Sequence, residues 1–216
     1  EQDRSFPYAP LFDILRPFFA QSPASDQLGK LGPLAPELAK LLPELGPLLS
    51  AAQPAATLDS EIEKRRLFEA LTTLFWHQAQ ANPILLVLED LHWSDQASLE
   101  FLLYLARRIA DMPVLLLLPY RHAESQAGLA ELLTGLDREP IAQEIRLDPL
   151  TRTEVTQLVQ AILDQPQTPS EEFVTAIYSL AEGNPFFTEE ICTSLISSGD
   201  IYYTHNQWQR KPLAQI

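Results

Sequence analysis

Two adjacent carboxylates, Glu89 and Asp90, follow directly after the apolar run 84–88. A continuous apolar run of this length predicts a strand that is buried on both faces, as in a parallel sheet. Ligands of open α/β sheets bind at the carboxyl ends of the strands. Neighbouring acids are costly to bury there unless a cation, hydrogen-bond donors or water meet them. In enzymes that hydrolyse nucleoside triphosphates, one such acid serves Mg²⁺ and a second orients the attacking water. The alternative is that both acids only cap the turn after the strand.

The other residues that could do chemistry indicate no metal site. The chain has one cysteine, Cys192, and His77, His122 and His205 show no metal-ligand spacing with it. A single cysteine forms no intrachain disulfide, which fits a reducing, cytoplasmic compartment. The formal net charge of −14 argues against direct nucleic-acid binding, which needs cations that displace counterions from phosphates. The apolar runs are too short to span a bilayer, so no membrane partner is expected.

Alternating strands and helices are expected to hold the two acids in place. Capping residues and an apolar face at helical spacing predict a helix over residues 60–80. A second helix over 96–110 separates the first strand from a buried strand at Val114 to Leu118, and Glu144 to Leu147 is a third strand candidate. Strands separated by helices predict an α/β fold with a parallel, doubly wound sheet.

Helical segments are expected on both sides of this core. A short helix that stops at Pro17 comes first, because proline removes a backbone donor, and proline-rich helical turns packed on the body follow over 21–57. From Thr151, which can form a capping box with Glu154, the pattern changes to helices only, and a β-hairpin over 201–210 follows them. The predicted domains are an α/β core over 1–150, a helical subdomain over 151–198 and a hairpin segment over 199–216.

The segment Leu86 to Asp95 resembles the Walker B segment of STAND-class AAA+ ATPases. The match is to those found in large LuxR-type transcriptional regulators and in cyclase- or kinase-linked AAA proteins. The resemblance covers nearly the whole chain and implies a partial P-loop NTPase (AAA+-like) fold followed by a helical lid. Four further segments resemble, in order, the stretch after the family's first βα unit, the helix before Walker B, the sensor strand and the glycine-x-proline lid motif: Pro7 to Pro10, Arg65 to Leu71, Leu115 to Arg121 and Gly183 to Glu190.

The resemblance implies roles for individual residues. Glu89 matches the position that supports Mg²⁺ through water, although many families place aspartate there. Asp90 matches the acid that polarises water for hydrolysis. Arg121 matches the sensor arginine that approaches the γ-phosphate, and its alternative is a surface salt bridge. Pro185 matches the lid proline that packs near adenine, and its alternative is a proline at the first position of a helix.

One departure from the family pattern matters most. No phosphate-binding G-x-x-x-x-G-K-[ST] loop occurs in the chain, and in the family that loop lies upstream of a segment like 6–10. The chain starts at Glu1 with no Met and ends at Ile216 without a stop-like signal, and we expect both ends to be cuts in a longer protein. The missing strand would lie between those at Val114 and Ile145, so self-association through open sheet edges is expected. His92 and Trp93 are expected to be packing residues beneath the nucleotide-facing loop.

Two functions stay open at this point. In the first, the parent protein binds ATP with Mg²⁺ and switches conformation on hydrolysis, relaying a signal to C-terminal output domains that begin with a winged-helix module. The fragment alone is then expected to be inactive and to bind no cofactor, because its affinity for ATP is on the order of millimolar or weaker. In the second, the segment is a scaffold or protein-interaction module with a relic nucleotide site.

Overall fold

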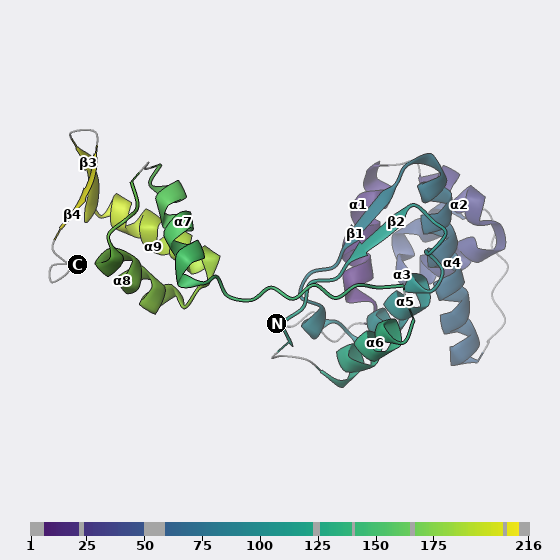
Figure 1. The fold of residues 1–216 in the computed structure, drawn as a ribbon. Helices are drawn as coiled ribbons and strands as arrows, with labels where there is room; N and C mark the ends of the chain where they lie inside the picture. Colours follow the sequence, from purple (N-terminus) through teal and green to yellow (C-terminus); the bar gives the residue numbers. More distant parts are fainter. Residues whose placement is uncertain are drawn as a thin grey trace. The chain divides into compact units, whose positions relative to one another are not determined.

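The computed structural model describes residues 7–21, 24–49, 59–122, 126–139, 141–164, 167–204 and 207–211. The chain divides into two compact units, Glu1–Gln143 and Glu144–Ile216 (Figure 1). Each unit has its own hydrophobic core. No helix among the described residues is long and apolar enough to cross a lipid bilayer. The first unit contains α1 (Ala9–Gln21), α2 (Ala24–Leu31), η2 (Gly32–Leu34), α3 (Ala35–Leu41), η3 (Pro43–Leu48), α4 (Ser60–Ala81), β1 (Ile84–Val87), η4 (Leu91–Trp93), α5 (Gln96–Ala106), β2 (Val114–Leu117) and α6 (Ala127–Asp137).

The two strands of the first unit form a parallel sheet. β1 pairs with β2 from Ile84 opposite Val114 to Val87 opposite Leu117. Both strands lie where the apolar runs predicted them, and α5 connects them as a βαβ crossover. The predicted α/β fold with a parallel sheet and flanking helices is therefore confirmed.

One face of this sheet is exposed among the residues that the structure describes. Leu86 is buried on the covered face, whereas the side chains of the opposite face are about half exposed. The register pairs Leu85 with Leu115 and Val87 with Leu117, so these four side chains lie next to one another on the exposed face. The expectation that the strands are buried on both faces is therefore wrong. The exposed fractions are 58% for Leu85, 40% for Val87, 64% for Leu115 and 50% for Leu117.

The predicted third strand, Glu144 to Leu147, does not form. Residues 142–151 are neither helix nor strand, and Ile145 and Leu147 are 73% and 91% exposed. A strand needs a neighbour that satisfies its backbone N–H and C=O groups. The expected neighbour, the strand that would precede a phosphate-binding loop, is not among the described residues. The prediction that Ile145 joins the sheet is therefore wrong for this chain.

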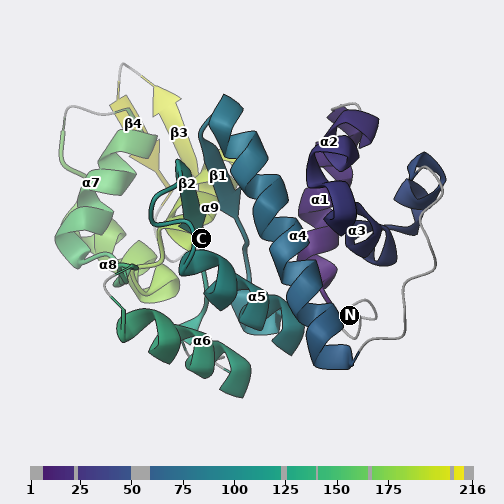
Figure 2. The same cartoon turned by 90° about the vertical axis from the view of Figure 1, so that its right-hand side faces the viewer.

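The helix α4 lies at the centre of the first unit (Figure 2). It packs on α2 and α3 on one side and on α5 and β1 on the other. Asp59 caps the start of α4, because its carboxylate accepts a hydrogen bond from the backbone N–H of Glu61 at 3.3 Å. The predicted apolar face is buried over four of its residues, Phe68, Leu71, Leu74 and Phe75, whereas Ile62 at the start of the helix is half exposed and Leu67 is partly buried.

Between residues 24 and 49 the proline-rich segment forms short helices packed on this core, as expected, and the rest of the segment, 22–23 and 50–57, lies outside the described residues. Leu28 of α2, Leu38 of α3 and Leu42 directly after α3 are buried. The expectation that the first helix stops at Pro17 is wrong, because α1 continues to Gln21. Phe18 and Phe19 on that last turn pack against the core, which offsets the hydrogen bond that Pro17 removes.

A buried carboxylate joins α3 to α4. Glu37 is 2% exposed, and its oxygens lie 2.9 Å from Nζ of Lys40 and 3.1 Å from Nε of Arg66. The side chains of Lys40 and Arg66 are themselves 41% and 38% exposed. The hydrogen bond to Glu37 raises the pKa of Lys40. The cluster thus combines one buried charge with two cations that water still reaches.

The second unit is a three-helix bundle followed by a hairpin. The helices pack on one another and bury a small apolar core that includes Val155, Phe173 and Ile177. The predicted capping box at the first helix is confirmed, and hydrogen bonds from Thr151 lower the pKa of the Glu154 carboxyl. That this bundle acts as a nucleotide lid stays a prediction. The elements are α7 (Arg152–Ile162), α8 (Glu171–Ala181), α9 (Pro185–Ser197), β3 (Ile201–Thr204) and β4 (Gln207–Arg210).

The strands of the predicted hairpin pair as expected. β3 runs antiparallel to β4, and the residues of the turn at 205–206 lie outside the described part of the chain. Lys211 anchors the end of β4, because its Nζ lies 2.7 Å from Oδ1 of Asp200. Hydrogen bonds from Lys211 and then Ser198 lower the pKa of Asp200.

The thiol of Cys192 is expected to be unreactive in the folded chain. It is fully buried in the core of the second unit, and burial raises the pKa of the thiol to about 11. The thiolate is the reactive form, and with this pKa roughly one thiol in 10,000 is ionised at pH 7. Alkylation with iodoacetamide, followed by mass spectrometry, should be slow for native chain and fast in denaturant. Equal rates in the two conditions would contradict the buried position.

Candidate functional site

The carboxyl ends of β1 and β2 bring three of the predicted site residues to one edge of the sheet. Glu89 and Asp90 follow β1, Arg121 follows β2, and the two strands are parallel neighbours. Backbone hydrogen bonds continue past the strands, from Leu88 N to Leu117 O at 3.1 Å and from Leu91 N to Pro119 O at 3.2 Å. Backbone hydrogen bonds therefore hold the segment of the two acids next to the segment of the arginine.

The backbone turns sharply at Asp90. Its φ of 54° lies in the left-handed region, which aspartate tolerates better than most residues because its short side chain can hydrogen-bond locally. The turn leads into η4, where the N–H of Trp93 donates to the carbonyl of Asp90 at 2.8 Å. Glu89 is exposed, and the Asp90 side chain is 53% exposed. Both carboxylates are therefore open to water or to a hydrated ion.

These carboxylates fit a magnesium ion that keeps most of its water shell. Mg²⁺ in phosphate-handling sites is bound through one or two carboxylates and the substrate phosphates, and Glu89 and Asp90 offer accessible oxygens at one place. A site in which protein side chains supply most of the metal ligands would need a larger cluster. No group of three or more His, Cys, Asp or Glu side chains that could hold a metal lies in the described parts of the chain.

His92 lies beneath this turn and contacts both segments. Its ring is buried, and Nδ1 accepts a hydrogen bond from the backbone N–H of Arg121 at 3.4 Å. Its Nε2 lies 3.8 Å from Oδ1 of Asp90. The expectation that His92 only packs beneath the loop is therefore incomplete. Sequence alone could not reveal the contact, because it depends on where the end of β2 lies.

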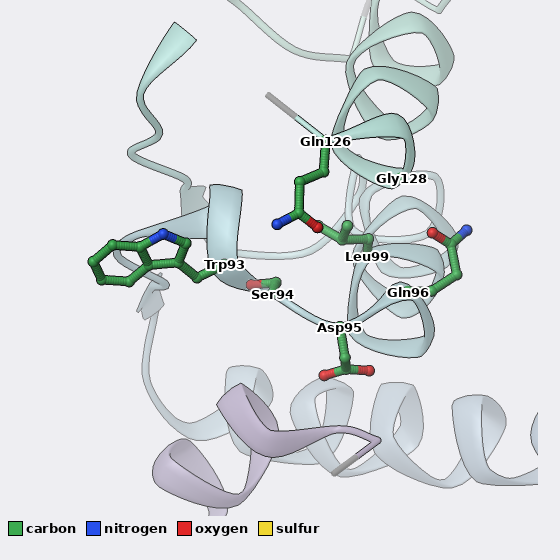
Figure 3. A pocket seen from close by; sticks show the side chains of 7 residues that line it. All are labelled: Trp93, Ser94, Asp95, Gln96, Leu99, Gln126 and Gly128. Atoms are coloured by element: carbon green, nitrogen blue, oxygen red, sulfur yellow. The ribbon is translucent and has the colours of Figure 1, made fainter. Parts of the chain in front are cut away.

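A pocket of about 260 Å³ opens beside the site, between the starts of α5 and α6 (Figure 3). Asp95 lines it, but its carboxylate is occupied. It accepts hydrogen bonds from the backbone N–H of Ser98 at 2.9 Å and of Tyr8 at 3.1 Å. Asp95 thus caps α5 and fixes the start of the described chain to it. The other residues that line the pocket are Trp93, Ser94, Gln96, Leu99, Gln126 and Gly128.

Pro185 belongs to the second unit and begins α9. Asn184 caps that helix, because its side-chain oxygen accepts hydrogen bonds from the backbone N–H groups of Phe186 at 3.0 Å and Phe187 at 3.4 Å. Pro185 is exposed at the first helical position, which matches the local alternative for this residue. Gly183 precedes the cap with a φ of 78°. A nucleotide contact of Pro185 stays a prediction.

Comparison with known proteins points to one family. Residues 1–118 match the family model of the AAA ATPase domain. The chain is also 26% identical over 142 residues to the peroxide stress-activated histidine kinase mak3 of Schizosaccharomyces pombe. That match covers 65% of this chain and 6% of the kinase, so the chain spans a small part of the length of this relative. No solved structure matches the chain.

Proposed function

The chain belongs to the AAA ATPase domain family, and from this premise we propose that it is the acidic part of an ATP-dependent signalling switch of the STAND class. The observation that carries the proposal is the placement of Glu89, Asp90 and Arg121 at the carboxyl edge of one parallel sheet. In open α/β sheets this edge is where ligands bind. Two acids and one arginine are among the groups that take part in phosphoryl transfer to water.

Each residue has a distinct role in the proposed site. Glu89 holds a water of the metal ion, and Asp90 orients the attacking water and accepts its proton. Arg121 compensates the charge on the γ-phosphate. Bound Mg²⁺ would supply neutralising charge to the phosphates. The exposure of both carboxylates supports these roles, because water and a hydrated ion reach them without displacing the core.

The proposal requires a phosphate-binding loop from elsewhere in the polypeptide. The chain contains no G-x-x-x-x-G-K-[ST] sequence. The single arginine does not offset the combined negative charge of a triphosphate and the two acids. We propose that a preceding segment supplies this loop and that output domains follow the hairpin, as in a LuxR-type regulator. The small share of the histidine kinase that the chain matches supports a place within a longer signalling protein.

Asp90→Asn is expected to lower ATP hydrolysis about tenfold, the effect of about 1.4 kcal/mol on the barrier, and to spare ATP binding. The amide keeps the size of the side chain but no longer accepts a proton. The test uses a protein that carries this chain together with its phosphate-binding loop, with single-turnover hydrolysis and calorimetric ATP binding measured separately.

Asp111→Asn is the matched control, because Asp111 is an exposed acid in the turn that precedes β2, at the opposite edge of the sheet. It should leave both quantities unchanged. If Asp90→Asn hydrolyses ATP like the unaltered protein, Asp90 does not orient the water. The scaffold with a relic site then becomes the better account.

A further inference from the structure

We propose that His92 is a positioning residue that fixes Asp90 and the backbone at Arg121 relative to each other. The inference rests on the proposed function, since it assigns a task within that site. His92 is 1% exposed, so its ring does not reach a substrate in solution. Its two nitrogens face the two segments that carry the site, one toward each.

The contact at Nδ1 fixes the tautomer of the ring, and the position of Nε2 is compatible with that tautomer. A backbone N–H donates to Nδ1, so Nδ1 must present its lone pair and cannot carry a proton. In the neutral ring the proton then lies on Nε2, and this N–H faces Oδ1 of Asp90 at 3.8 Å. A carboxylate is an acceptor, so donor and acceptor match. At 3.8 Å the two atoms are too far apart for a hydrogen bond, and the proposal requires that they approach when substrate binds, as catalytic hydrogen bonds commonly tighten in the substrate complex.

The ring is held in place by its surroundings. His92 lies in η4, whose first residue, Leu91, is hydrogen-bonded to the carbonyl of Pro119 after β2. The indole of Trp93 contacts the imidazole at a centroid distance of 4.7 Å. A shift of the backbone at Arg121, such as one caused by phosphate contact, therefore moves the imidazole and with it the Nε2–H donor that faces the carboxylate of Asp90.

The tautomer can be tested in the chain itself. Long-range ¹H–¹⁵N correlation spectra of ¹⁵N-histidine-labelled chain should show His92 with a protonated Nε2 and an unprotonated Nδ1. Assignment comes from the loss of one signal in His92→Gln. A signal from protonated Nδ1 would overturn the proposal, because the Arg121 N–H would then have no acceptor at that atom.

Substitutions can separate the two contacts. His92→Asn keeps an acceptor near the position of Nδ1 but loses the donor toward Asp90. His92→Gln keeps a donor near the position of Nε2 but loses the acceptor for Arg121. In the protein that carries the phosphate-binding loop, we expect His92→Asn to lose about tenfold in kcat at unchanged ATP affinity. We expect His92→Gln to retain kcat and to bind ATP about tenfold more weakly.

A purely structural role for His92 would give a different result. Both variants would then lose stability, and kcat and ATP affinity would change together in each. That outcome, or two variants that behave like the unaltered protein, would overturn the proposal. Asp90→Asn separates this failure from a failure of the proposed function. If Asp90→Asn lowers kcat and the His92 variants do not, the function stands and the positioning role is wrong.

Discussion

Replacing Gly183 by alanine is expected to lower the free energy of unfolding of the second unit by about 3–5 kcal/mol, from backbone strain together with overpacking. The new Cβ would overlap the carbonyl oxygen of Leu150 and lie 3.0 Å from Cβ of Pro149. The two segments cannot separate easily, because the N–H of Leu150 donates to the carbonyl of Gly183 at 2.8 Å. Urea denaturation followed by circular dichroism measures the loss.

Gly199→Ala is the matched control for this substitution. Gly199 has a φ of 71° in the same unit, but a Cβ there meets nothing within 4 Å. It therefore carries the conformational strain alone, about 1–2 kcal/mol. Equal losses for the two variants would show that the contact with Leu150 contributes nothing. Hydrogen exchange at the amides of α8 and α9 should rise for Gly183→Ala well above its value in the control.

Removing both cations from the Glu37 cluster is the second large effect. The double variant with Lys40→Met and Arg66→Met should lose about 3–5 kcal/mol of stability, because it leaves a buried carboxylate without partners. Glu37→Met should cost less, about 1 kcal/mol, since the two cations left behind are partly exposed and water can hydrate them. The expected asymmetry follows from which member of the cluster is buried.

Chemical denaturation of the double variant and of Glu37→Met measures this asymmetry. Arg65→Met serves as the control, because Arg65 pairs with Glu69 at 3.3 Å on the exposed side of α4. Such an exposed pair contributes about 0.5 kcal/mol or less. If Glu37→Met destabilises the chain as much as the double variant does, the cluster does not behave as one buried charge with two solvated partners.

Local patterns predicted most of the regular structure. Proline directly precedes each of the apolar runs that form β1 and β2, at Pro83 and Pro113, and an apolar run that starts at such a break is a pattern strong enough to place a strand. Capping residues located the starts of α4 and α7, because Asp59 and Thr151 satisfy backbone N–H groups that any helix start leaves free. The order of the two strands and their parallel pairing followed from the helix between them.

Features that depend on distant neighbours could not be predicted in this way. The segment 144–147 alternates polar and apolar residues like a strand, yet pairing is a property of two segments, and its expected partner is not among the described residues. α6 was missed, although Leu129, Leu132 and Leu136 lie at helical spacing and are buried. The contact of His92 with the end of β2 requires the fold itself.

The exposed face of β1 and β2 also decides how the polypeptide behaves in concentrated solution. Leu85, Val87, Leu115 and Leu117 form an apolar surface that attracts other apolar surfaces at short range, while the net charge of −14 keeps molecules apart at longer range. Salt screens the repulsion beyond about 10 Å at 0.1 M, and sulfate strengthens the apolar attraction. Ammonium sulfate therefore acts on both forces in the same direction, and a dilute buffer of low ionic strength keeps the chains dispersed.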